Sequence, residues 1–176
     1  MSELQKSLTK SSKPVTVYLG LGSNMESRQD NLEQALSFLS HRLRVERVSS
    51  VYDTEPIGNI EQPRFLNLVC QVVNTNLAPM ALLTLAKGIE SKLGRVSSKP
   101  NAPRPIDIDI LFYGDRVIKT PRLVIPHPRL AERVFVLIPL AEIAPDLVHP
   151  VIKKTIKELL EAVTEKQGVF KWEQSL

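Results

Sequence analysis

Two aspartates, Asp107 and Asp109, stand in the segment Arg-Pro-Ile-Asp-Ile-Asp-Ile-Leu at positions 104–111. Their alternation with isoleucines is the period of a half-buried strand, so both carboxylates are predicted to project from the face that the isoleucines do not fill. Side chains so placed lie roughly 6–7 Å apart and can hold one divalent cation, or two over a phosphate chain. A cation would also remove the repulsion between the two charges. The alternative is a solvated strand face with two incidental acids.

Positive charge accumulates around this segment. Between positions 92 and 133 the chain has nine basic residues and four acids, two of which are the aspartate pair. Six of the nine are arginines, whose planar fork matches phosphate, so the stretch suits a polyphosphate with its metal. The basic residues are Lys92, Arg95, Lys99, Arg104, Arg116, Lys119, Arg122, Arg129 and Arg133. The net charge of +4 also indicates an anionic partner, but more weakly.

A second candidate site lies further toward the N-terminus. A loop rich in proline and glycine, at 54–64, leads into a predicted strand that carries Phe65 and Asn67 on one face. An aromatic ring for stacking and an amide that can hydrogen-bond an edge suit a flat heterocycle. The alternative is a core phenylalanine and a turn-capping asparagine.

Hydrophobic periodicity predicts an α+β protein. Strands are predicted over 15–21, 45–52, 65–73, 106–113 and 117–118, and helical segments over 29–43, 79–93, 129–143 and 153–163. Ser27 is expected to cap the first helix and Pro139 to interrupt the third. The order favours a ferredoxin-like β-α-β-β-α-β sandwich with extra C-terminal helices, and a doubly wound sheet is the rival. We expect one catalytic domain at 14–165 between a flexible N-terminal tail, 1–13, and a C-terminal tail, 166–176.

The composition is that of an ordinary globular protein, with 43% hydrophobic and 24% charged residues in 176. No apolar run approaches the roughly 18–20 residues that span a bilayer, and the polar first dozen residues do not form a secretory signal. The single cysteine, Cys70, lies in an apolar run and is predicted to be a buried, inert thiol, which fits a reducing, cytoplasmic setting. Gly-Leu-Gly-Ser-Asn at 20–24 lacks the Lys-Ser/Thr of a Walker motif, so ATP would be bound without a P-loop.

Several motifs, in this order along the chain, together resemble the 6-hydroxymethyl-7,8-dihydropterin pyrophosphokinase family. The most specific is Pro-Arg-x-Ile-Asp-Ile-Asp-Ile-Leu, with Pro-His-Pro-Arg-Leu behind it. The matching stretches are Gly22-Ser23-Asn24, Ser50-x-Tyr52-x-Thr54-x-Pro56, Phe65-Leu66-Asn67, Ile89-Glu90, Gly94-Arg95, 103–111, 126–130, Arg133, Phe135 and 139–145. The resemblance extends from about Val15 to Pro150, which is most of the chain.

The resemblance implies a folate-pathway enzyme that moves the β,γ-pyrophosphoryl group of ATP onto the hydroxymethyl oxygen of a reduced pterin and releases AMP. The implied catalytic residues are Arg95, Arg104, Asp107 and Asp109, of which the two aspartates would bind two Mg²⁺ ions. The implied pterin-binding residues are Thr54, Ile57, Gly58, Phe65, Asn67 and Phe135. The implied ATP-binding residues are Glu90, Arg104, Ile110, Arg122, His127 and Arg133.

ATP and 6-hydroxymethyl-7,8-dihydropterin are thus the expected partners, without nucleic acid or membrane, and the sequence leaves the oligomeric state open. The loop 96–103 has Lys99 but lacks the extra arginines and the tryptophan of some members, a departure that concerns closure and ATP affinity. Three alternatives stay open. They are an RNA-recognition module, although the glycine-aromatic consensus is absent, a different two-metal enzyme, and a catalytically inactive binding relative.

Overall fold

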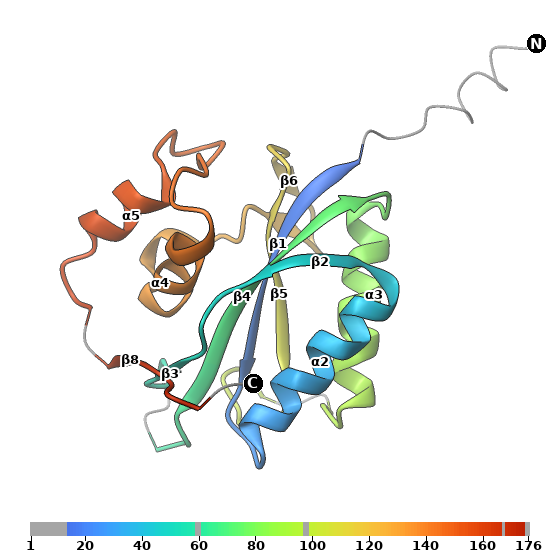
Figure 1. The fold of residues 1–176 in the computed structure, drawn as a ribbon, viewed down its shortest axis with the longest axis vertical. Coiled ribbons are helices and arrows are strands. Elements are labelled where there is room, and N and C mark those ends of the chain that lie inside the picture. Colours follow the sequence, from blue (N-terminus) through green and yellow to red (C-terminus); the bar gives the residue numbers. More distant parts are fainter. Residues whose placement is uncertain (1–13, 59–60, 97–98, 167, 175–176) are drawn as a thin grey trace, which may run out of the picture.

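A single antiparallel sheet of six strands forms the centre of the molecule (Figure 1). The computed structural model describes residues 14–58, 61–96, 99–166 and 168–174. The sheet strands are β1 (Val15–Ser23), β2 (Arg44–Val48), β3 (Tyr52–Thr54), β4 (Phe65–Thr75), β5 (Asp107–Tyr113) and β8 (Val169–Lys171). Their order is β5-β1-β4-β3-β8, with β2 also paired to β4, and every one of these pairings is antiparallel. The doubly wound parallel sheet is therefore wrong.

Helices cover both faces of this sheet, as Figure 1 shows. The helices are α2 (Arg28–Arg42), α3 (Pro79–Lys92), α4 (Val134–Ile143) and α5 (Ile156–Ala162), and a 3-10 turn spans Leu130–Glu132. One core cluster joins α2 and α3 to the sheet, for example through Leu39 and Leu82, and a second joins α4 and α5 to the other face, for example through Leu137 and Leu159. The chain is therefore a mixed α/β protein in three layers, which agrees with the predicted α+β class and its extra C-terminal helices.

The predicted strand at 45–52 is in fact two strands, β2 and β3. The hydroxyl of Ser49 accepts a hydrogen bond from the backbone N–H of Val69, and the backbone N–H of Ser50 donates to the Glu142 carboxylate. One backbone hydrogen bond, from the Ser49 N–H to the Val69 carbonyl at 2.8 Å, keeps this stretch beside β4. The side-chain contacts take the place of further ladder pairing, and the chain pairs with β4 again from Tyr52. A small hairpin of β6 (Ile118–Lys119) and β7 (Val124–Ile125) follows β5.

Two predicted helix signals are wrong. Ser27 precedes α2 in a left-handed conformation, with φ of 52°, and its side chain caps nothing. Pro139 lies inside α4 without interrupting it. The proline costs the helix one backbone hydrogen bond, but the burial of its neighbours Leu137 and Leu140 stabilises the helix against that loss. The helical segment breaks at Arg133 instead, where the 3-10 turn ends and α4 begins.

The prediction of a C-terminal tail is wrong for residues 169–171, which form β8 and pair with β3. A strand of three residues is too short for its alternation to be visible in the sequence. The predicted N-terminal tail lies outside the described residues. Cys70 is fully buried as expected, and burial raises the pKa of its thiol to about 12. Within the described ranges, none of the helices combines the length and apolar character that crossing a bilayer requires.

Glu142, near the end of α4, connects that helix to β3. Its carboxylate accepts hydrogen bonds from the Tyr52 hydroxyl at 2.6 Å and from the Ser50 hydroxyl at 2.8 Å. Burial opposes ionisation of Glu142, but these hydrogen bonds outweigh it and lower its pKa below the ordinary 4.5. The interaction therefore stabilises the fold above that pH and is lost as the pH falls through the lowered pKa.

We expect Tyr52→Phe to lower the free energy of unfolding by about 1 kcal/mol at about pH 7, because a partly solvated hydrogen bond to a carboxylate is lost. The difference from the native chain should vanish at a second, strongly acidic pH below the lowered pKa of Glu142, where that carboxyl group is protonated. Urea unfolding at both pH values measures this. Glu161→Gln, on the exposed face of α5, is the control. An equal difference at both pH values would contradict the assignment.

Candidate active site

The aspartate pair lies on β5 at the edge of the sheet, and its isoleucine neighbours account for its orientation. Ile106, Ile108 and Ile110 are buried in the core that α2 and α3 share with the sheet. Both carboxylates point to the opposite face, with side-chain exposures of 23% for Asp107 and 36% for Asp109. The predicted strand and the shared face of the two carboxylates are confirmed.

Two arginines neutralise Asp107. A terminal nitrogen of Arg95 donates to its Oδ1 at 2.6 Å, and Nε of Arg104 lies 3.5 Å from its Oδ2. Burial by itself would raise the pKa of Asp107, but the hydrogen bond from Arg95 and the charge of Arg104 outweigh it and lower that pKa. Asp107 is therefore a carboxylate held ionised by a built positive environment.

Glu90 of α3 positions both the Asp107 strand and Arg95. Its side chain is 3% exposed, and its Oε1 accepts from the backbone N–H of Ile108 at 2.8 Å and from Arg95 at 3.2 Å. Lys87 approaches its Oε2 to 3.1 Å. One buried carboxylate thus fixes both the strand that carries the aspartates and the guanidinium that contacts Asp107.

Asp109 has the opposite electrostatic setting. Burial and the neighbouring charge of Asp107 raise the pKa of Asp109 to about 7. The ring Nε2 of His127 lies 4.0 Å from its Oδ2, but burial and the charge of Arg133 lower the pKa of His127 to about 4. At neutral pH the histidine is therefore an uncharged ring, so the repulsion between the aspartates is left for another cation to relieve.

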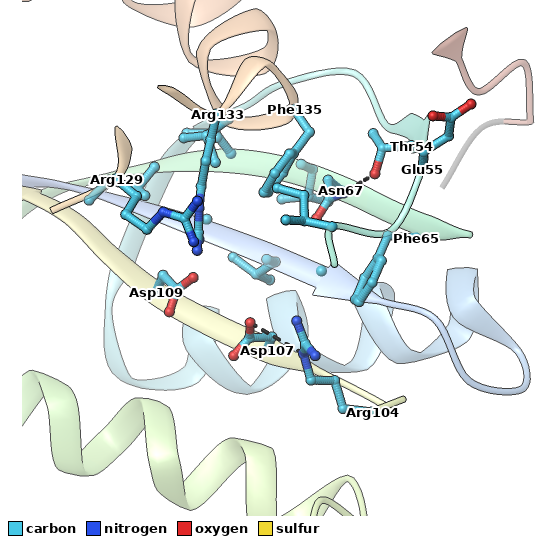
Figure 2. A pocket seen from close by; sticks show the side chains of 18 of the residues that line it. Thr54, Glu55, Phe65, Asn67, Arg104, Asp107, Asp109, Arg129, Arg133 and Phe135 are labelled. Carbon is cyan, nitrogen blue, oxygen red and sulfur yellow. Dashed lines mark hydrogen bonds and ion pairs between the residues drawn. The ribbon is translucent and has the colours of Figure 1, made fainter. Parts of the chain in front are cut away.

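A cavity opens beside the aspartates (Figure 2). Phe65 from the start of β4 and Phe135 from the first turn of α4 face it from two sides. Asn67 and Thr54 lie between them, and the Asn67 amide donates to the Thr54 hydroxyl at 2.6 Å. The cavity therefore presents two aromatic rings and a buried polar edge.

Gly22 of β1 allows this polar edge to exist. A Cβ added at this position would lie 2.5 Å from Oδ1 of Asn67 and 3.6 Å from the ring of Phe65. The first distance is far below van der Waals contact, so any side chain at position 22 would displace the Asn67 amide. The glycine is therefore a space requirement of the cavity.

A second cavity borders the same aspartates from the side of α3 and the 99–104 loop. Its lining is strongly basic and includes Lys87, Arg95 and Lys99, with the uncharged ring of His127 beside them. The residues that line both cavities are Asn101, Arg104, Asp107, Asp109 and Arg133. Two cavities of different character, one flanked by aromatic rings and one lined by cations, therefore meet at the aspartate pair.

Buried amide side chains join the loops that border the first cavity. Asn24 donates to Oε1 of Gln62 at 2.7 Å, and its own oxygen accepts from the backbone N–H of Arg104 at 2.8 Å. The amide of Gln62 in turn donates to the carbonyl of Asn101 at 2.9 Å. The guanidinium of Arg104 then lies over the Phe65 ring, 4.8 Å from its centroid. These contacts place the loop at 61–64 and the loop at 99–104 in a fixed relation.

Most of the predicted site residues gather around the two cavities. Those that line one or both are Thr54, Ile57, Phe65, Asn67, Glu90, Arg95, Arg104, Asp107, Asp109, His127, Arg133 and Phe135. Three predicted residues line neither of them. Gly58 stands in the loop beyond Ile57, Ile110 is buried in the core, and Arg122 is exposed on the β6–β7 hairpin.

Sequence reasoning missed several residues that border the site, namely Asn24, Gln62, Lys87, Asn101 and Arg129. Three of them stand in matching or singled-out stretches, Asn24 in Gly-Ser-Asn, Gln62 in the proline-rich loop and Arg129 in Pro-His-Pro-Arg-Leu. The motifs therefore drew attention to these three residues, but they did not show that their side chains border the site. Of the 96–103 loop, residues 97 and 98 lie outside the described residues, and Lys99 lines the second cavity.

Among the described residues, no three His, Cys, Asp or Glu side chains gather as a metal-binding group. The acidic donors at the junction of the cavities are Asp107 and Asp109. A cation there would take its remaining ligands from substrate oxygens or water, which is the usual arrangement of Mg²⁺ in phosphate-transfer sites.

Comparison with known proteins identifies the family. Residues 18–145 match the family model described as 7,8-dihydro-6-hydroxymethylpterin-pyrophosphokinase (HPPK). The chain is 40% identical over 159 residues to the 2-amino-4-hydroxy-6-hydroxymethyldihydropteridine pyrophosphokinase of Bacillus subtilis, covering 89% of this chain and 90% of that protein. It is 43% identical over 143 residues to the Aquifex aeolicus protein of the same name, covering 81% and 89%.

Longer proteins also contain this unit. The folic acid synthesis protein fol1 of Schizosaccharomyces pombe is 42% identical over 171 residues, which are 94% of this chain and 23% of fol1. A crystal structure of Plasmodium falciparum HPPK-DHPS has a TM-score of 0.71 at 19% identity and covers 88% of this chain and 46% of that one, so it shows the shared fold. The family expected from the motifs is confirmed: the chain belongs to the 7,8-dihydro-6-hydroxymethylpterin-pyrophosphokinase (HPPK) family.

Proposed function

We propose that this chain transfers the pyrophosphoryl group of ATP to the hydroxymethyl oxygen of 6-hydroxymethyl-7,8-dihydropterin, with Asp107 and Asp109 at the point of transfer. The observation that carries the proposal is the meeting of an aromatic-flanked cavity and a cationic cavity at these two carboxylates. In the reaction, the hydroxymethyl oxygen forms a bond to the β-phosphorus, the bond from that phosphorus to the α,β-bridging oxygen breaks, and AMP leaves. The hydroxyl proton is released, which balances the equation.

The first cavity fits a pterin. A flat bicycle stacks between the rings of Phe65 and Phe135, which stand on two sides of the cavity (Figure 2). Its hydrogen-bonding edge meets the Asn67 amide and the Thr54 hydroxyl, which are both buried. A buried amide without its partner costs more than a solvated one, so this edge discriminates against ligands that lack matching donors and acceptors.

The two aspartates fit divalent cations, and we assign two Mg²⁺ ions to them. Their carboxylates are hard oxygen donors on one face, and burial together with the charge of Asp107 raises the pKa of Asp109, a cost of ionisation that a bound cation would offset. When bound, the ions would supply positive charge to the phosphate groups and would ease deprotonation of the attacking hydroxyl. Arg104 and Arg133 border both cavities and hold positive charge where the triphosphate crosses between them.

We expect Asp107→Asn to reduce pterin-dependent AMP formation by on the order of 10²–10³-fold, because metal-bridged phosphate loses several kcal/mol of stabilisation. The measurement is AMP release from ATP and Mg²⁺ with and without the pterin. Asp115→Asn, in the exposed turn after β5, is the matched control and should keep native activity. ADP in place of AMP would contradict pyrophosphoryl transfer, and no turnover by the folded native chain would identify an inactive relative.

We expect Gly22→Ala to raise the KM for the pterin by about tenfold or more, because the added methyl displaces the Asn67 amide and a lost buried hydrogen bond costs about 1–3 kcal/mol. The KM for ATP should stay near its native value. Gly88→Ala is the control, since a Cβ at that helical position meets nothing within 4 Å. An unchanged pterin KM in Gly22→Ala would show that the Asn67 edge does not bind the substrate.

A further inference from the structure

The C-terminal strand β8 lies against the outer edge of β3, the strand that ends at Thr54 in the first cavity. The registered pairs are Thr54 with Val169, Asp53 with Phe170 and Tyr52 with Lys171. Beyond both ends of this ladder, the backbone N–H of Glu55 donates to the Gly168 carbonyl at 3.1 Å and that of Trp172 donates to the Val51 carbonyl at 2.8 Å. The whole stretch 51–55 is therefore paired on its outer side.

Gly168 makes the closest approach to the loop that follows β3. It adopts a φ of 74°, and a Cβ added there would lie 2.6 Å from the Glu55 carboxyl carbon. Its carbonyl also accepts from the Arg64 guanidinium at 3.0 Å. Glu55 and Arg64 are residues of the two arms of the 54–64 loop, so one carbonyl of the C-terminal segment contacts both arms.

The aromatic rings of Trp172 and Phe170 reinforce this contact, because each has an arginine guanidinium stacked over it. The Arg28 guanidinium lies 5.2 Å from the centre of the Trp172 ring, and that of Arg64 lies 5.6 Å from the centre of the Phe170 ring. Both arginines form ion pairs with Asp53 of β3. The indole N–H of Trp172 further donates to Gln29 on α2 at 3.3 Å. The segment is thus attached to the body of the protein at several points around β3.

We propose that residues 168–172 are a positioning element of the pterin site: they hold Thr54 and Glu55 in the arrangement that receives the substrate. This inference rests on the proposed function. Without β8, the three residues of β3 would be paired with β4 alone, and an edge so short frays readily. Neither cavity is lined by residues 168–172, so the segment acts on the substrate only through Thr54 and Glu55.

The second cavity supplies the internal comparison. Its lining residues come from α3, Arg95 and Val96, the 99–104 loop, β5 and the segment 127–133, whereas β8 packs against β3. Loss of the C-terminal segment should therefore weaken pterin binding while ATP binding is unchanged. A contribution to overall stability alone would affect both substrates or neither.

Two truncations of the full chain test the proposal. A chain of residues 1–172 keeps β8 and Trp172 and is the matched control, whereas a chain of residues 1–166 lacks the whole segment. We expect the control to match the full chain and the shorter chain to show a pterin KM raised by about tenfold. This is the effect expected if about one backbone residue that β8 had held in place must instead be ordered when the pterin binds. Its KM for ATP should change by less than about twofold on the same scale.

Each result has a defined meaning. An unchanged pterin KM in the 1–166 chain, or an equal rise in both KM values, would overturn the positioning role. Absence of AMP formation by the full chain would instead overturn the proposed function, and calorimetric titration of the pterin would still test the segment. Should the 1–166 chain fail to fold, Trp172→Ala replaces it. Its pterin KM should rise and recover in Trp172→Phe, and a native KM in Trp172→Ala would reject the proposal.

Discussion

The repulsion between Asp107 and Asp109 is the constraint to which the rest of the site responds. Two carboxylates on one strand face, partly removed from water, are costly unless positive charge surrounds them. The protein compensates Asp107 with the guanidinium groups of Arg95 and Arg104, and Glu90 holds the first of these in place. Asp109 has no equally close partner among the described residues, so burial and the charge of Asp107 still raise its pKa.

The same compensation explains why α3 and β5 pack as they do. Glu90 is a fully enclosed carboxylate on a helix, and it is tolerated because the Ile108 N–H, Arg95 and Lys87 satisfy its oxygens. Its hydrogen bond to the strand backbone locks the register of β5 against the helix. The geometry of the aspartate pair is thus fixed by the packing of a strand and a helix, and not by a flexible loop.

The cavity flanked by Phe65 and Phe135 depends instead on the absence of a side chain at one position. Its polar edge exists because position 22 has no side chain, and its walls come from separate elements, β4 for Phe65 and α4 for Phe135. Glu142 joins α4 to β3, and β8 closes the other edge of β3. The polar edge of the cavity is therefore held by contacts from α4 and from the edge strand β8.

The sequence by itself determined the parts of this protein that depend on local pattern. The strand with both carboxylates on one face follows from period-two alternation, and the family follows from collinear motifs such as the one around His127. Tertiary structure alone decided what depends on long-range contacts. Strand β8, the split at Ser49 and the Asn24–Gln62 contact each join residues distant in the chain, and no local periodicity encodes such a partner. The exposed position of Arg122, outside the lining of both cavities, was likewise decided by the hairpin that carries it, because a residue type does not encode its tertiary surroundings.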